Sequence, residues 1–138
     1  MPTIYDKNGD AYVKFYQFDP SELVDDDECP SPVVNFARES SASIGCIGEI
    51  FVAETSRKQG VGTGLLTQAL KALQNGGCDR VYLLVDSSED VDRLVRWYRQ
   101  FGFQHIGTQG YKTPEGTAYD VFMGRTLTKD DVLGRQKT

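Results

Sequence analysis

The pattern of hydrophobic and polar positions begins with a strand-like alternation. Residues 11–16 read Ala-Tyr-Val-Lys-Phe-Tyr, and the pair Asn8-Gly9 precedes them. Asn-Gly is typical of a tight hairpin turn, because glycine accepts the positive φ that such turns need. We therefore predict a β-hairpin over residues 3–18. A loop rich in proline and aspartate is expected over residues 19–32, with its acidic run exposed to solvent.

The next segments predict two strands and then a helix. Residues 33–37 and residues 44–52 have the composition of strands. A helix of roughly four turns is expected to begin near Gly60 or Val61. Apolar residues recur on one face of this helix, namely Leu65, Leu66, Ala69, Leu70 and Leu73. Gly76-Gly77 should end it, since glycine tolerates the left-handed conformation that follows many helices.

A second strand and helix follow, and then a hairpin. The continuous apolar run Val81–Val85 predicts a strand covered on both faces. Ser87 and Asp90 resemble a capping box that begins a helix. That helix has an apolar side made of Val91, Leu94, Val95, Tyr98 and Phe101. Strands are expected near residues 103–108 and 117–126, with Pro-Glu-Gly turn residues between them.

The order strand, helix, strand, helix, hairpin indicates an α/β fold with a mixed sheet. Because a helix joins strand 46–52 to strand 81–85, these two strands should be parallel, with a right-handed crossover. The hairpins on either side should be antiparallel. We expect one domain over residues 1–138, in which residues 1–44 form an atypical N-terminal hairpin and acidic loop and residues 128–138 form a flexible tail.

Composition and charge narrow the possible functions. A length of 138 residues supports one hydrophobic core, and a net charge of −5 argues against a broad nucleic-acid-binding face. Three widely spaced cysteines and one histidine form neither a disulfide framework nor a metal site. No stretch resembles a signal peptide or a membrane span. We predict a cytoplasmic protein with no metal, no nucleic-acid partner and no membrane partner.

The sharpest chemical feature is a glycine-rich loop between strand 46–52 and the following helix. It reads Arg57-Lys58-Gln59-Gly60-Val61-Gly62-Thr63-Gly64. Glycines let a ligand approach the backbone, and the first N–H groups of a helix attract phosphate together with the positive end of its dipole. Thr63 could add a hydroxyl donor, and Arg57 or Lys58 a positive charge. We interpret the loop as a phosphate or pyrophosphate site; the alternative is a tight turn without a ligand.

Two familiar phosphate loops do not fit these residues. A P-loop ends in Gly-Lys-Ser/Thr, where this chain has Gly62-Thr63-Gly64. A dinucleotide fingerprint needs a third glycine three residues after the second, where Leu65 stands. Residues 57–62 instead resemble, at each position, the pyrophosphate loop Arg/Gln-x-x-Gly-x-Gly/Ala of the GNAT superfamily of N-acetyltransferases.

A second motif carries the same resemblance. Residues 98–103, Tyr-Arg-Gln-Phe-Gly-Phe, are similar to the Tyr-x-x-x-Gly-Phe of that family at the end of the next helix. The resemblance covers roughly residues 45–127. Either motif alone is weak, but together, in the expected elements, they are fairly specific.

The resemblance implies an enzyme that uses acetyl-CoA as a substrate and acetylates a primary amine of a small molecule or protein by direct attack. It assigns the pantetheine arm to the strand end and polarisation of the thioester carbonyl to backbone N–H near Val52. The implied acetyl-CoA-binding residues are Phe51, Val52, Ala53, Arg57, Lys58, Gln59, Gly60, Val61, Gly62 and Thr63.

Two catalytic roles follow from the same resemblance. Tyr98 would protonate the leaving thiolate, and a core tyrosine without catalysis is the alternative. Glu49, three residues before Val52, would act as the base directly or through water. Glu54 and Asp120 are alternative bases, and a solvent-facing Glu49 is the competing interpretation.

Two departures from the family pattern affect the function. The family often has Asn one or two turns before the tyrosine, whereas residues 89–92 read Glu-Asp-Val-Asp. It also usually has two helices near its start, which residues 1–44 are not expected to form. We therefore expect an open acceptor side, or one completed by a second subunit in a homodimer. The alternative function is a non-catalytic CoA-binding or protein-interaction module.

Overall fold

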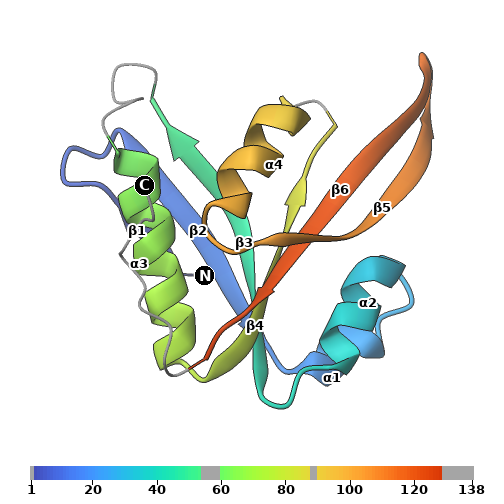
Figure 1. Ribbon diagram of the computed structural model, residues 1–138, viewed down its shortest axis with the longest axis horizontal. Coiled ribbons are helices and arrows are strands. Elements are labelled where there is room, and N and C mark those ends of the chain that lie inside the picture. Colours follow the sequence, from blue (N-terminus) through green and yellow to red (C-terminus); the bar gives the residue numbers. More distant parts are fainter. Residues whose placement is uncertain (1, 54–59, 88–89, 129–138) are drawn as a thin grey trace.

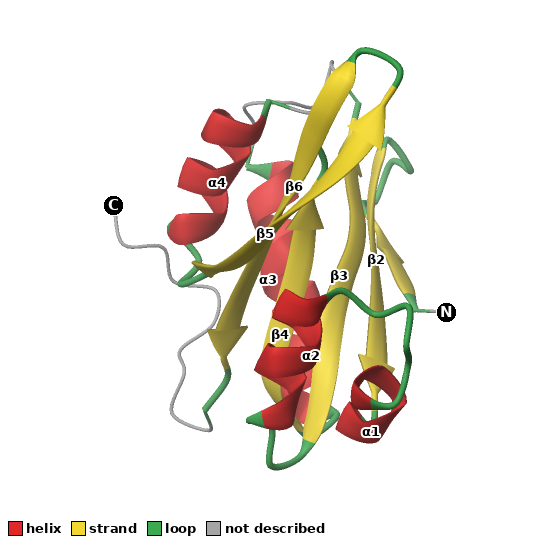
Figure 2. Ribbon diagram, turned by 90° about the vertical axis from the view of Figure 1, so that its right-hand side faces the viewer, coloured by secondary structure: helices red, strands yellow, loops and turns green. Residues whose placement is uncertain are grey.

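A six-stranded mixed sheet forms the centre of the molecule, and helices cover both of its faces (Figures 1 and 2). The computed structural model describes residues 2–53, 60–87 and 90–128. The sheet has the strand order β1-β2-β3-β4-β6-β5, which confirms the expected α/β fold. Its strands are β1 (Thr3–Tyr5), β2 (Ala11–Phe18), β3 (Ser43–Val52), β4 (Cys78–Val85), β5 (Gln104–Thr113) and β6 (Gly116–Thr126), and the helices are α1 (Pro20–Val24), α2 (Ser31–Arg38), α3 (Val61–Asn75) and α4 (Val91–Arg99).

Most of the predicted elements are confirmed. β1 and β2 form the antiparallel hairpin, whose turn contains Gly9 at φ 74°. The long helix begins at Val61 and is followed by Gly77 at φ 92°, the left-handed conformation expected of a terminating glycine. β3 and β4 are parallel, and β5 and β6 are antiparallel. The strand predicted over residues 103–108 extends to Thr113, so the last hairpin is longer than expected.

α3 and α4 cover one face of the sheet. Alternate residues of each strand point to this face, so Val13 of β2 and Val81, Leu83 and Val85 of β4 are fully or almost fully buried there. The predicted apolar face of α3 packs on these strands, with each of its members at most 2% exposed: Leu65, Leu66, Ala69, Leu70 and Leu73. This larger core fixes the start of α3 against the end of β3.

α1 and α2 cover the lower part of the opposite face, as drawn in Figure 1. A second core forms there between the two helices and the sheet, made of Leu23, Val33, Phe36, Ala37, Ile44 and Phe122. Figure 1 shows both helices at the end of the sheet away from the arrowhead of β3. The two helices therefore do not cover this face near the end of β3. Two large apolar side chains are exposed there, Phe51 at 44% and Leu84 at 45%.

Two predictions for the N-terminal segment are wrong. Residues 33–37 were expected to form a strand but lie in α2, because Val33, Phe36 and Ala37 fall at i, i+3 and i+4 and share one buried face. The predicted loop contains α1, whose N-cap Asp19 accepts a hydrogen bond of 3.0 Å from the backbone N–H of Ser21. Residues 1–44 thus contain two short helices, contrary to the expectation from their sequence.

Two smaller predictions in the centre of the chain also need correction. The N-cap of α4 is Asp90, whose carboxylate accepts the N–H of Arg93 at 3.4 Å, rather than Ser87. The Ser87 hydroxyl instead lies 2.9 Å from the hydroxyl of Tyr111. β4 is not covered on both faces along its whole length, since Leu84 near its end is exposed.

Candidate active site

The two central parallel strands separate at their carboxyl ends. β3 pairs with β4 from Ser43↔Cys78 to Ile47↔Leu83 and no further. Beyond Ile47, β3 stays with β2 as far as Val52, while β4 stays with β6 as far as Val85. The two strands therefore diverge beyond Ile47, and Figure 1 shows β3 and β4 pointing away from each other.

A β-bulge in β3 lies at the point of divergence. Ile47 pairs with Phe15 and Glu49 pairs with Lys14, so Gly48 is an extra residue opposite β2. The extra residue reverses the alternation of side chains, because each residue of a strand points to the face opposite its neighbour. Ile50 and Val52 consequently pack on the core under α3, and Glu49 and Phe51 stand on the other face.

Glu49 is the centre of a small polar and aromatic group on that face. Its Oε2 accepts a hydrogen bond of 2.7 Å from the hydroxyl of Tyr12, and its Oε1 lies 3.8 Å from Nζ of Lys14. The hydrogen bond to the carboxylate raises the pKa of Tyr12, because it favours the protonated phenol. The ring of Phe51 stacks on that of Tyr12, with 5.6 Å between their centroids.

The start of α3 lies on the opposite face, close to the end of β3. Gly60 caps the helix in the left-handed conformation, at φ 75°. A Cβ added to Gly60 would have no atom within 4 Å, whereas one added to Gly62 would lie 3.4 Å from Val52 and 3.6 Å from Trp97. The first turn of α3 therefore contacts β3 and α4. The space beside Gly60 is open with respect to the described residues.

The residues expected to bind acetyl-CoA divide into two groups. One group, Phe51–Ala53, lies at the end of β3. The other, Gly60–Thr63, lies at the start of α3, which contacts the end of β3. The backbone N–H of Ala53 donates to Asp10 on the β2 side. Because backbone groups alternate along a strand, the N–H of Val52 is directed toward the opposite edge, where β4 diverges. Arg57, Lys58 and Gln59, like the alternative base Glu54, lie outside the described residues.

Tyr98 lies on α4 and contributes to the larger core, where its side chain is 9% exposed. Its ring packs against Trp97 and Phe103, with centroid distances of 5.0 Å and 5.9 Å. Tyr98 and Glu49 therefore belong to opposite faces of the sheet. Side chains on opposite faces can contact the same reacting atom only where two neighbouring strands are not hydrogen-bonded to each other. β3 and β4 diverge at such a place.

The remaining candidate base, Asp120, lies on β6 next to the last residue paired with β4. One of its carboxylate oxygens, Oδ1, is shielded from solvent and has no hydrogen-bond partner among the described residues. Glu49, by contrast, has a hydrogen-bond donor and a lysine beside it.

Two residues that contact Glu49, Tyr12 and Lys14, were not among the site residues predicted from the sequence. Both were assigned correctly to the N-terminal hairpin, and their alternation placed them on one face. Their partner could not be identified, because Glu49 joins that face only through the bulge at Gly48. The described residues contain no cluster that could hold a metal ion and no helix long and apolar enough to cross a membrane.

Comparison with known proteins agrees with this geometry. The family model for acetyltransferases of the GNAT family matches residues 5–103. Among curated proteins, there is no significant match. Three solved structures of low sequence identity share the fold, as follows.

The NatC complex bound to Gag peptide and CoA contains a chain 16% identical, with a TM-score of 0.62, over 86% of this chain and 62% of that one. The ribosomal-protein-S18-alanine N-acetyltransferase of Escherichia coli is 17% identical (TM-score 0.59; 92% and 68% covered). NAA60 of Arabidopsis thaliana in complex with acetyl-CoA is 17% identical (TM-score 0.64; 88% and 69%). This chain thus spans 62% to 69% of their length.

Proposed function

The chain belongs to the acetyltransferase (GNAT) family, and from this premise we propose that it transfers the acetyl group of acetyl-CoA to a primary amine of a small molecule or protein. The observation that carries the proposal is the divergence of β3 from β4. It lies beside a glycine-led helix start and between Glu49 on one face and Tyr98 on the other. The structural relatives crystallised with CoA or acetyl-CoA support the same substrate.

Acetyl-CoA would approach from the face covered by α3 and α4. The first N–H groups of α3, at Val61 and Gly62, have no acceptor within the helix and carry the positive end of its dipole. They would hold the pyrophosphate, with Thr63 and the basic residues Arg57 and Lys58 beside them. The pantetheine arm would run along Phe51–Ala53 as an added strand, and the Val52 N–H would stabilise the thioester oxygen as it gains charge.

The amine would approach from the face that holds Glu49. An alkylammonium ion has no lone pair, so a proton must leave before attack. Glu49 would take this proton, directly or through water, and the amine nitrogen would bond to the carbonyl carbon. As the C–S bond breaks, the sulfur of CoA would take a proton from the Tyr98 hydroxyl. The newly bonded nitrogen would lose its second proton as the amide forms, and this proton would restore Tyr98 through solvent. The two side chains thus act on opposite faces of one opening in the sheet.

The cellular compartment and the oligomeric state are also part of the proposal. The three cysteines are free thiols, which supports a reducing compartment such as the cytoplasm. A homodimer stays a prediction, to be measured by light scattering with and without acetyl-CoA.

Calorimetry with acetyl-CoA, followed by mass spectrometry with a mixture of amine acceptors, tests this function. We expect saturable binding and an acetylated product. Tyr98→Phe should lower kcat about 10²-fold or more, with Kd for acetyl-CoA changed less than about twofold, because it removes only the acid. The matched control Tyr119→Phe, on the exposed final hairpin, should retain the wild-type rate.

Two outcomes would contradict the proposal. Absence of heat with acetyl-CoA would exclude both the enzyme and a CoA-binding module. Binding without any acetylated amine, in the wild type as in Tyr98→Phe, would leave a binding protein on this fold.

A further inference from the structure

One amine of this chain already lies beside the candidate base. Lys14 and Glu49 are directly paired across β2 and β3, and Nζ of Lys14 lies 3.8 Å from Oε1 of Glu49. The same nitrogen lies 5.5 Å from the centroid of the Tyr12 ring, within the range of a cation–π contact. These contacts hold the Lys14 side chain in place. It is still 37% exposed, so it is accessible from the face of the sheet that holds Glu49, called here the acceptor face.

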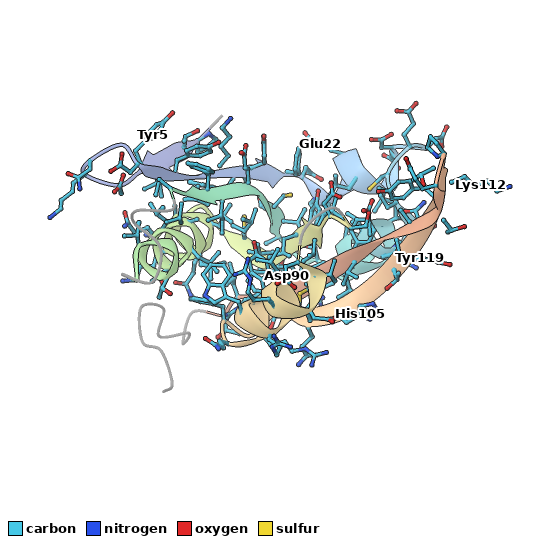
Figure 3. The ribbon with its side chains drawn as sticks, turned by 90° about the horizontal axis from the view of Figure 1, so that it is seen from above. Tyr5, Glu22, Asp90, His105, Lys112 and Tyr119 are labelled. Carbon is cyan, nitrogen blue, oxygen red and sulfur yellow. The ribbon has the colours of Figure 1, made fainter. Side chains whose placement is uncertain are left out.

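The other described lysines occupy different surroundings. Lys7 stands in the exposed turn before β2, Lys71 is exposed on α3, and Lys112 is exposed on the final hairpin. Figure 3 shows Lys112 at the end of the molecule away from Tyr5. Among the lysines that the structure describes, only Lys14 makes an ion pair with a carboxylate or lies over an aromatic ring.

The position of Lys14 along the sheet is also favourable. Its partner Glu49 is two residues beyond Ile47, the last residue of β3 that pairs with β4. Only β3 therefore lies between Lys14 and the opening, and neighbouring strands are about 4.8 Å apart. The flexible four-carbon stem of a lysine spans about that distance, and here it already leans toward β3.

We propose that Lys14 is a site of self-acetylation, modified by the active site of its own chain. This inference rests on the proposed function, because it needs acetyl-CoA at the opening between β3 and β4. Glu49 would accept one proton from the Lys14 ammonium, and Nζ would form a bond to the carbonyl carbon of the thioester. The C–S bond breaks, and the CoA sulfur takes a proton from Tyr98. Nζ loses a second proton as the amide forms, and this proton restores Tyr98 through solvent, while Glu49 releases the first proton to solvent.

Attachment to β2 favours this reaction over attack by a free amine. A nucleophile held near its target acts at a high effective concentration, because no translational entropy is lost on binding. Acetylation would replace the ammonium with a neutral amide. The ion pair with Glu49 and the cation over Tyr12 would be lost, so the acceptor face would carry one positive charge fewer. Self-acetylation would therefore change the affinity of this face for cationic acceptors.

The test is a time course of the full-length chain with acetyl-CoA, digested and analysed by mass spectrometry. Exposed lysines react slowly with acetyl-CoA without catalysis, so Lys7 and Lys112 serve as internal controls. We expect Lys14 to be acetylated at least about tenfold faster than either. Glu49→Gln should reduce Lys14 to the rate of the controls, and an excess of unacetylated CoA should do so in the wild type. Because the step is intramolecular, its rate should not depend on protein concentration.

Acetylation of Lys14 at the rate of Lys7 and Lys112, or a Lys14 rate unchanged by excess CoA, would overturn the inference. The CoA competition uses the wild-type chain, so it decides the matter even where Glu49→Gln does not fold. A parallel assay with free amines separates the two proposals. Turnover of free amines without acetylation of Lys14 overturns only self-acetylation, whereas absence of both reactions overturns the proposed function as well.

Discussion

The hydroxyl of Tyr12 donates a hydrogen bond of 2.7 Å to Oε2 of Glu49 across two neighbouring strands. The contact depends on the bulge at Gly48, which turns Glu49 out of the core and onto the face of Tyr12. Nζ of Lys14 lies 3.8 Å from the other carboxylate oxygen, Oε1. Glu49 is thus held in a fixed place by side chains of β2.

Removing the carboxylate should cost far more activity than removing its partner. We expect Glu49→Gln to lower kcat/KM for a free amine about 10²- to 10³-fold, the usual contribution of a general base. Tyr12→Phe should lower it about tenfold, since it removes one hydrogen bond to a charged group. Tyr5→Phe is the matched control, because Tyr5 belongs to the same row of rings and is 62% exposed. Equal losses for Tyr12→Phe and Glu49→Gln would contradict the assignment of roles.

Gly48 should be difficult to replace because of Tyr16. A Cβ at Gly48 would overlap Cε2 of the Tyr16 ring and lie 3.3 Å from its Cζ. We expect Gly48→Ala to lower the free energy of unfolding by about 1–3 kcal/mol in urea denaturation, as overpacking usually does. Tyr16→Leu, which shortens the obstructing side chain, should recover part of that loss in the double variant.

Gly64→Ala provides the opposite expectation as a control. A Cβ at Gly64 meets nothing within 4 Å, and the residue lies inside α3. Alanine should therefore raise the free energy of unfolding by about 0.5–1 kcal/mol through helix propensity. A Gly48→Ala variant as stable as the wild type would show that β3 can lose its bulge or that Tyr16 moves without cost.

Gly60 should be sensitive for a different reason, its backbone conformation. At φ 75°, an alanine is strained even though its Cβ would touch nothing. We expect Gly60→Ala to lower the free energy of unfolding by about 1–2 kcal/mol, and Gly60→Asn by less, because asparagine tolerates the left-handed region. Calorimetric Kd values for acetyl-CoA should rise in the same order. Equal effects of Ala and Asn would show that the conformation of Gly60 does not matter.

The fold was predictable where the pattern of apolar residues had one meaning. The apolar stripe of α3 and the Asn-Gly hairpin each allow one structure, and both are confirmed. Val33–Ala37 was ambiguous, because a five-residue apolar segment fits a strand or one turn of a helix. The segment forms a helix because its apolar side chains pack on the second face of the sheet. This packing, of Phe36 with Ile44 and Phe122, is visible only in the structure.

The candidate site was visible in the sequence only in part, for a similar reason. Motifs that lie within one element, such as the glycine-led start of α3, are visible in the sequence. The group of Tyr12, Lys14 and Glu49 depends on the register between β2 and β3, which one inserted residue changes. No local pattern distinguishes Gly48 as a bulge from a glycine in a regular strand. The faces of side chains beyond it could therefore not be assigned from the sequence.

The cysteines give a prediction that does not depend on catalysis. Burial raises the pKa of the Cys46 thiol to about 11, and burial with the nearby charge of Asp79 raises that of Cys78 to about 11. The pKa of the Cys29 thiol is also raised, chiefly by burial. A thiolate is the reactive form, and at pH 8 a thiol of pKa 11 is ionised about 100-fold less than one of pKa 9. Alkylation of the folded chain should therefore modify Cys29 first, and denaturant should remove the difference.

The same shifts set the direction of the pH dependence of stability. The folded state favours the protonated thiols of Cys46 and Cys78, so their contribution is fully present below pH 9 and is lost as the pH rises through about 11. The raised pKa values of Tyr12 and Tyr82 act in the same direction at still higher pH. Urea denaturation of the wild type should thus show a free energy of unfolding that falls from pH 9 upward. In the double variant Cys46→Ala/Cys78→Ala the fall should be shallower, since the two thiols that resist ionisation in the folded state are gone. An identical slope in both proteins would mean that these thiols ionise as readily in the folded chain as in the unfolded one.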